Sequence, residues 1–212
     1  MKRSIFSATV AALALFVALP LVAQAPKGWK MRVDRSMNAE DPDAAGAVNF
    51  VAKGAGFLAS NPKAAVYWNP ANTITGDYTL KGTFTRLNST GDNEYYGLVF
   101  GGSDLDGAGR AYLYFMVTDD GTFLIKSRNG NSTDNVSEKT PSAAVKKPDA
   151  SGKAVNTLEV RVEASKVEFV VNGTVVSSMP RTGALAKTDG IYGIRINHHL
   201  EVQVTGFGVT KV

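Results

Sequence analysis

The segment LEVRVEASKVEFVVNGTVVSS, residues 158–178, decides the fold class of this chain. Hydrophobic residues alternate with charged ones in its first half, which is the two-residue period of a strand with one buried face. The alternation resumes after a short polar break, and Asn172-Gly173 then forms a pair that accepts the positive φ angles of a tight hairpin turn. The segment predicts three antiparallel strands, with these side chains in the core: Leu158, Val160, Val162, Val167, Phe169 and Val171.

Further strand-like runs, separated by turn residues, follow one another without a long helical pattern. Asp120-Gly121 lies between two aromatic and β-branched runs and predicts a second hairpin. The longest stretch without a strand signal is 131–152, which we expect to be a surface excursion. About eleven short strands predict an all-β protein with a two-sheet antiparallel β-sandwich of the jelly-roll type.

The N-terminus has the pattern of a secretory signal peptide. Lys2 and Arg3 precede an apolar run that is shorter than the ~20 residues needed to span a bilayer. Cleavage is expected after Ala23, with Ala25 as the alternative. The predicted organisation is a signal peptide at 1–23, an N-terminal lead at 24–47 and one β-sandwich domain at 48–212, in a secreted or periplasmic protein.

The charge balance limits the expected partners, and the cysteine content limits what can stabilise the fold. Without Lys2 and Arg3, 21 Lys and Arg face 19 Asp and Glu, and the basic residues are not clustered, so nucleic acid is not an expected partner. No membrane span is expected in the mature chain. The chain has no cysteine, so its stability must come from its core. The oligomeric state stays open.

Three segments resemble the concanavalin A-like lectin/glucanase superfamily: NTLEVRVEASKVEFVVNGTVV, TDGIYGIRINHHLEVQVTGFGV, and YYGLVFGG with the Tyr-rich run after it. They are most similar to laminin-G-like and 3-keto-disaccharide hydrolase-type jelly rolls of exported bacterial proteins. The resemblance implies two curved sheets, with sugars bound on the concave sheet or at its rim. It implies no activity, because the acidic E-x-D-x-E strand of the glucanases is missing, and so are the Asn-Ser-Gly-Ile and Glu-x-Gln elements of the hydrolase type.

Catalytic candidates are few. Asp104 and Asp106, in GGSDLDGAGR, are the best pair of carboxylates for glycoside hydrolysis. We favour a simpler interpretation, in which both aspartates hydrogen-bond the backbone of their own glycine-rich turn. The hard oxygens of Asp-x-Asp-Gly leave calcium as the one conceivable cofactor, although the full EF-hand pattern is absent; otherwise no cofactor is expected.

The pair His198-His199 is not expected to bind a metal. Adjacent residues on a strand point to opposite faces, so the two rings converge only if the strand is bulged. The chain has only these two histidines, which disfavours a His-rich metal site.

Alternate residues of a strand point to the same face of a sheet, and this alternation (residue parity) suggests a ligand-binding face. Tyrosine rings beside fixed hydrogen-bond donors suit the apolar face and the hydroxyls of a sugar. The alternative, that the tyrosines only complete the core, is left open. The residues expected on the concave sheet are Tyr95, Tyr112, Tyr114, Lys126, Arg128, Arg195 and Asn197.

Three functions are consistent with these observations. The first is a non-catalytic carbohydrate-binding jelly roll, with a glycan as its partner. The second is a glycoside-active hydrolase of the 3-keto-disaccharide hydrolase type. The third is a structural or protein-interaction module of the cell envelope, which an apolar concave face would favour.

Overall fold

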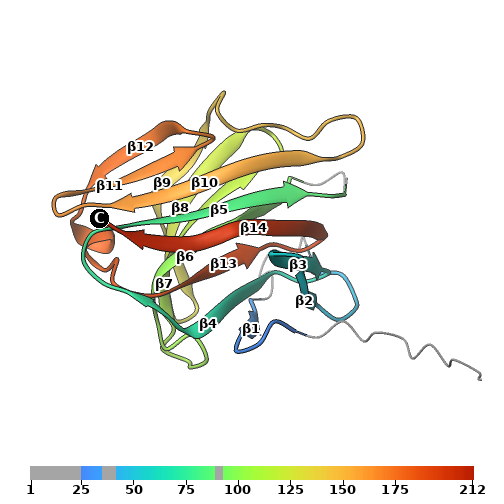
Figure 1. Cartoon of the computed structure of the whole chain (residues 1–212), viewed down its shortest axis with the longest axis horizontal. Coiled ribbons are helices and arrows are strands. Elements are labelled where there is room, and N and C mark those ends of the chain that lie inside the picture. The colour runs from blue at the N-terminus through green and yellow to red at the C-terminus, as the bar shows by residue number, and fades with distance from the viewer. Residues whose placement is uncertain (1–24, 35–41, 89–92) are drawn as a thin grey trace, which may run out of the picture.

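A computed structural model of the chain describes residues 25–34, 42–88 and 93–212. These residues form two antiparallel seven-stranded sheets packed face to face (Figure 1). The first sheet has the strand order β1 (Lys30–Val33), β4 (Ala65–Ile74), β13 (Gly190–Ile196), β6 (Tyr95–Ser103), β7 (Ala111–Thr118), β8 (Thr122–Asn129) and β9 (Ser132–Pro141). The second has the order β12 (Thr174–Pro180), β11 (Lys166–Val171), β10 (Ala154–Val162), β5 (Tyr78–Arg86), β14 (Leu200–Lys211), β3 (Gly56–Asn61) and β2 (Asn49–Lys53).

The predicted all-β sandwich is confirmed, with fourteen strands rather than about eleven. A short 3₁₀ turn, η1 (Gly183–Ala186), is the one helical element in the described part of the chain. The meander of β10, β11 and β12 pairs as expected, and Asn172 and Gly173 both have positive φ at its second turn. The second hairpin joins β7 and β8 at Gly121, whose φ is also positive.

The segment 131–152 was expected to hold no strand, and that expectation is wrong. It contains β9, which pairs with β8 at the edge of the first sheet. Most side chains of β9 are exposed and polar, so the strand carries no hydrophobic alternation. Edge strands of this kind are held by backbone hydrogen bonds to one neighbour.

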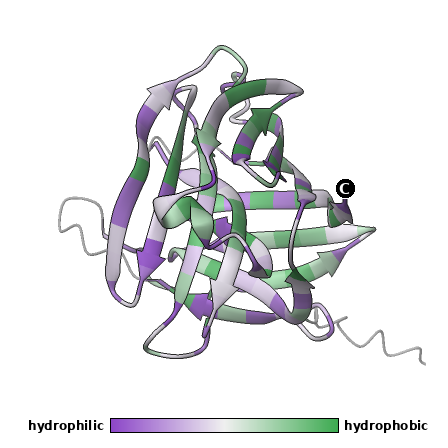
Figure 2. Cartoon of the chain, turned by 90° about the vertical axis from the view of Figure 1, so that its left-hand side faces the viewer, coloured by the Kyte–Doolittle hydropathy of each residue, from purple (hydrophilic) through white to green (hydrophobic). Residues whose placement is uncertain are grey.

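The main core lies between the sheets, and its side chains come from alternate positions of each strand. Along many strands hydrophobic and hydrophilic residues alternate as green and purple bands (Figure 2). Leu98 and Phe100 of β6 face this core, as do Leu158 and Phe169 of the meander. The core assignments made from parity are therefore confirmed.

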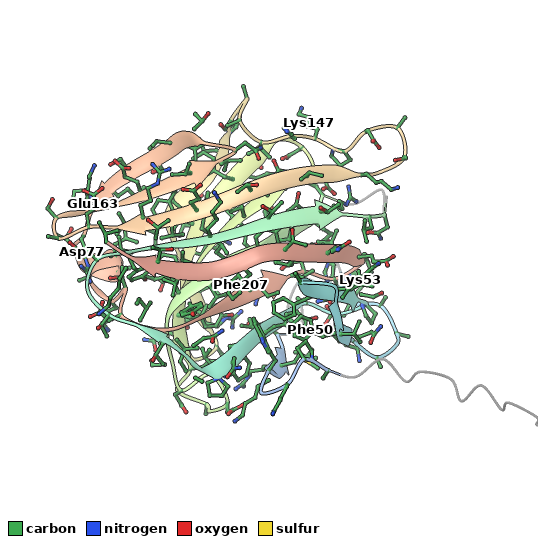
Figure 3. All side chains as sticks on the ribbon, in the orientation of Figure 1. Phe50, Lys53, Asp77, Lys147, Glu163 and Phe207 are labelled. Carbon is green, nitrogen blue, oxygen red and sulfur yellow. The ribbon has the colours of Figure 1, made fainter. Side chains whose placement is uncertain are left out.

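The N-terminal lead closes one edge of the sandwich. β1 pairs with β4 of the first sheet, while the Trp29 ring packs on Phe50 and Phe57 of the second, with centroids 5.5 and 4.5 Å away. Phe207 of β14 completes this aromatic cluster, and Figure 3 labels Phe50 and Phe207 near this edge. The described part of the lead is thus packed into the body of the sandwich.

A second, smaller cluster lies on the other face of the first sheet, away from the sandwich interior. β7 contributes residues to both clusters because its alternate side chains point to opposite faces. Trp68 is only 1% exposed in this cluster. The outer cluster consists of Val66, Trp68, Val99, Leu105, Tyr112, Tyr114, Met116 and Leu124.

Candidate functional site

Asp34, directly after β1, lies on the outer face of the first sheet and is held there by groups from two strands. Nη1 of Arg195 donates a 2.6 Å hydrogen bond to Oδ2 of Asp34, and the hydroxyl of Tyr112 donates one of 2.5 Å to the same oxygen. Arg195 also donates to the hydroxyl of Tyr112 at 3.1 Å. Only 4% of Asp34 is exposed, and these two donors satisfy its Oδ2 inside the protein.

Two more arginines approach the same carboxylate. Nη2 of Arg110 lies 3.4 Å from Oδ1 of Asp34, and Nε of Arg128 lies 3.3 Å from Oδ2. The guanidinium of Arg128 also lies 6.0 Å from the centre of the Tyr112 ring. Three guanidinium groups therefore surround one carboxylate, which leaves this part of the sheet with excess positive charge. We call Asp34, Arg110, Tyr112, Arg128 and Arg195 the arginine cluster.

The neighbouring groups of the cluster determine the protonation states of Asp34 and Tyr112. Burial opposes ionisation of Asp34, but attraction to Arg195, the hydrogen bond from Tyr112 and attraction to Arg128 outweigh it, so the pKa of Asp34 lies below its ordinary value. Burial raises the pKa of Tyr112 to about 12, so this phenol stays protonated and can donate to Asp34. At neutral pH Asp34 is therefore ionised, while Tyr112 keeps its proton.

Four of the seven predicted ligand-binding residues meet here. Tyr112, Arg128 and Arg195 belong to the cluster, and the ring centre of Tyr114 lies 5.4 Å from the Arg195 guanidinium. These side chains are buried and do not line an open groove. Tyr112 is 3% exposed, Tyr114 4% and Arg195 7%. Residue parity predicted correctly that these side chains share one face of the sheet. It did not predict that the Asp34 carboxylate lies on that face and contacts them.

The remaining three predicted residues lie nearby on the same sheet. Lys126 of β8 is paired with Tyr114 and is half-buried. Tyr95, at the start of β6, packs against the outer cluster, and the amino group of Lys139 lies 6.0 Å from its ring centre. Asn197 follows β13, and its backbone amide donates to the carbonyl of Tyr95 at 2.9 Å.

Sequence reasoning missed Asp34 and Arg110. Asp34 ends the alternating run of the N-terminal lead, and Arg110 immediately precedes β7. Neither belongs to a motif, and the contact between β1 and β7 spans 78 positions. The alternation of 29–33 was the one available signal that the lead pairs with a sheet.

A pocket of about 600 Å³ opens beside the arginine cluster, where the ends of β6 and β8 and the start of β7 face the η1 turn. Its size lies in the range of small-ligand sites. Tyr112 and Arg128 belong both to this pocket and to the cluster. Its polar lining residues are Ser103, Tyr112, Ser127, Arg128, Asn129, Asp134, Lys187 and Asp189.

The catalytic candidates Asp104 and Asp106 lie in the loop between β6 and β7. Oδ2 of Asp104 accepts the amide of Gly109 at 3.1 Å, and Asp104 itself has a positive φ of 48°. Asp106 forms an exposed ion pair with Lys30. The carboxylate of Asp104 therefore has the expected turn role, whereas that of Asp106 contacts the N-terminal lead instead of the backbone of its own turn.

The two histidines lie closer together than strand parity predicted. His198 and His199 lie in the turn between β13 and β14, and His199 has a φ of 59°. The left-handed backbone of His199 brings the two ring centres within 4.7 Å of each other, so the expectation that the rings diverge is wrong. Ligand atoms of Glu94, His198 and His199 all lie within 4.8 Å of one another, which makes them a possible metal site.

Comparisons with known proteins were made by sequence and by structure. No protein-family model matches the chain, and no curated protein matches it. Among solved structures it is similar to carbohydrate-binding module CBM66 from Bacillus subtilis, with a TM-score of 0.60 and 11% identity over 87% of this chain and 96% of that one.

Two further structures are similar. A putative glycosyl hydrolase from Parabacteroides distasonis has a TM-score of 0.52 and 11% identity, over 86% of this chain and 100% of that one. An alginate lyase, A1-II′, has a TM-score of 0.52 and 13% identity, over 87% and 95%. None of the helical structure in the described residues is long and apolar enough to cross a membrane. The chain therefore shares the fold of these structures, which is the jelly-roll fold expected from its resemblance to the concanavalin A-like lectin/glucanase superfamily.

Proposed function

We propose that this protein is an exported, non-catalytic carbohydrate-binding jelly roll, whose ligand occupies the pocket beside η1 at the end of the first sheet. The predicted signal peptide at 1–23 lies outside the described residues, and export is part of the proposal. The observation that carries it is the pocket of about 600 Å³ itself, whose polar lining includes Ser127, Asn129 and Lys187.

The arginine cluster fixes the strands β7 and β8 that line this pocket. Asp34 fixes the hydroxyl of Tyr112 and neutralises part of the charge of Arg128, so both side chains are held in place before ligand arrives. A site that is already ordered loses less conformational entropy on binding. Asn129 and Lys187 add donors on the exposed side of the pocket.

The proposed ligand lies along the pocket and reaches toward the other predicted residues of the sheet. Lys126 is the nearest of them to the tyrosines, because it pairs with Tyr114 across β7 and β8. Tyr95 is the first residue of β6, and Asn197 follows the last residue of β13. An oligosaccharide, rather than a single sugar, has the length to contact both ends of such a sheet.

The test uses the mature chain, residues 24–212, on a glycan array, followed by calorimetry with the oligosaccharides that bind. Asn129→Ala and Lys187→Ala change exposed pocket residues and are expected to weaken binding at least 10-fold without changing the melting temperature. Lys153→Ala, an exposed residue outside the pocket, is the matched control and is expected to bind like the wild type.

Two results contradict the proposal. One is that no oligosaccharide binds, and the other is that binding is unchanged in both pocket variants. Chromatography of the ligand after incubation is expected to return it intact. Cleavage products would replace the binding proposal with glycoside hydrolysis, with Asp104→Asn and Asp106→Asn as the first variants to assay.

A further inference from the structure

The turn between β13 and β14 joins the two sheets and lies at the end of the sandwich where β5 ends and β6 begins, on the right in Figure 1. The side-chain amide of Asn88, just after β5, holds this turn from both sides. Its nitrogen donates to the carbonyl of His199 at 2.8 Å, and its oxygen accepts the amide of Glu201 at 2.7 Å. A non-glycine residue in the left-handed region is costly unless its surroundings hold it, and such residues gather at functional sites.

Two carboxylates from separate segments face the first histidine. Nδ1 of His198 lies 3.0 Å from Oδ1 of Asp43, and Nε2 lies 2.7 Å from Oε1 of Glu94. Glu94 directly precedes β6, and Asp43 lies in the segment before β2. His198 and Glu94 are each only 2% exposed, while His199 is half-buried. The group thus lies just inside the surface.

This arrangement matches the way proteins orient a histidine for metal binding. A metal-binding histidine commonly donates its other ring N–H to a carboxylate, which fixes the tautomer and the ring orientation. Asp43 is placed to accept from Nδ1 of His198, and this leaves the lone pair of Nε2 directed at Glu94. We propose that Glu94, His198 and His199 together bind one Zn²⁺ ion, with Asp43 orienting His198.

The donor set decides between metals. Two imidazole nitrogens and one carboxylate oxygen suit Zn²⁺, whereas Ca²⁺ requires six to eight oxygen ligands. Three protein ligands leave the fourth tetrahedral position to water or to an external ligand. This differs from the calcium considered for the Asp104 loop in position, ligands and metal.

The geometry requires a small adjustment. In a tetrahedral zinc site the ligand atoms lie about 3.3 Å apart, given bonds of about 2.0–2.1 Å. The 2.7 Å contact between His198 and Glu94 must therefore open by about 0.6 Å, while the third ligand atom, now within 4.8 Å, moves closer. Without metal, a contact of 2.7 Å between Nε2 and Oε1 requires a proton between the two atoms. Zinc replaces this proton.

The experiment measures binding of Zn²⁺ alone to the mature chain after treatment with a chelator, by calorimetry and by metal analysis of the dialysed protein. One Zn²⁺ per chain is expected for the wild type. His199→Asn is expected to weaken binding at least 10-fold, and asparagine tolerates the left-handed backbone at this position. Glu94→Gln is expected to have a similar effect, and Asp43→Asn to weaken binding by about 10- to 100-fold.

Asp149→Asn, which changes an exposed loop carboxylate, is the matched control and is expected to bind like the wild type. Circular dichroism and the melting temperature without metal check that each variant is folded. Because His199 is half-buried, His199→Asn decides the matter even if Glu94→Gln does not fold. Cobalt in place of zinc is expected to give the visible absorption bands of a tetrahedral site.

The proposal is overturned if the wild type binds no stoichiometric Zn²⁺, or if His199→Asn binds it with wild-type affinity. Binding of Ca²⁺ in place of Zn²⁺ would also contradict it, because the donor set would then have been misjudged. The zinc site does not depend on the carbohydrate proposal, since none of its residues lines the pocket beside η1.

Discussion

Nη1 of Arg195 lies 2.6 Å from Oδ2 of Asp34, although the two residues are 161 positions apart in the chain. The contact attaches the end of β1 to β13, across the outer face of the first sheet. Both side chains are almost fully buried, so each charge has lost most of its contact with water. Such a pair is costly to break, because the partner that remains is a buried charge without compensation.

Asp34→Ala is therefore expected to destabilise the fold by about 3–5 kcal/mol. The loss has two parts, the hydrogen bonds from Arg195 and Tyr112 and the repulsion among the arginines that the carboxylate neutralises. Urea unfolding of the mature chain, followed by tryptophan fluorescence and circular dichroism, measures the difference in the free energy of unfolding.

Asp106→Ala is the matched control, because its carboxylate also pairs with the N-terminal lead, through Lys30. That pair is exposed, so its loss is expected to cost less than about 1 kcal/mol. Equal effects of the two substitutions would contradict the importance assigned to burial at Asp34.

The same carboxylate gives a prediction about pH. The pKa of Asp34 is lower in the folded protein than in the unfolded chain, because Arg195, Tyr112 and Arg128 favour its charged form more than burial disfavours it. Its contribution to stability is therefore present above about pH 4 and is lost as the pH falls through the folded pKa. Free energies of unfolding at pH 5, 4 and 3 should fall more steeply for the wild type than for Asp34→Asn. Parallel curves would contradict the prediction.

Two substitutions of Asn172, in the hairpin turn after β11, serve as controls for each other. Asn172 has a φ of 50°, and its side chain donates to the carbonyl of Ala144 and to Asn156 Oδ1, both at 2.8 Å, and accepts the amide of Thr157 at 2.9 Å. Asn172→Gly keeps the backbone conformation but removes these three hydrogen bonds, at an expected cost of about 2–4 kcal/mol. Asn172→Ala adds the strain of a left-handed residue, about 1 kcal/mol more.

Thermal and urea unfolding of both variants separate the two effects. The difference between alanine and glycine reports backbone strain, and the cost of glycine reports the hydrogen bonds. If both variants are as stable as the wild type, the turn depends on Gly173 alone and the side-chain contacts of Asn172 contribute nothing.

The sequence predicted those strands whose alternate residues are hydrophobic. The meander at 158–178 was predictable because Leu158, Val160 and Val162 repeat with a period of two and Asn172-Gly173 ends the second strand. β9 was not, because an exposed edge strand needs no hydrophobic face and its residues resemble a polar loop. The histidine turn also escaped prediction, since adjacent residues diverge only while the backbone is extended, and His199 is left-handed.

The candidate site was predictable to a smaller extent. Parity placed Tyr112, Tyr114 and Arg195 on one face, and they do lie together. Their burial depends on Asp34 and on other tertiary contacts, and sequence spacing carries no information about which distant segment lies over a sheet. Both carboxylates that contact His198 likewise come from segments far away in the chain, 104 positions from Glu94 to His198 and more from Asp43.

Substitution of Phe169, in β11, tests whether the interior of the sandwich provides most of the stability of the fold. Phe169 is fully buried, and its ring centre lies 5.1 Å from that of Phe115 and 6.2 Å from that of Phe100, both on the opposite sheet. Phe169→Ala is expected to cost about 3–5 kcal/mol, because burial is lost and a cavity remains between the sheets. Val175→Ala on β12, at a side chain that is 44% exposed, is expected to cost under about 1 kcal/mol in the same urea titration. A loss at Phe169 as small as that at Val175 would mean that the two sheets do not depend on this aromatic contact.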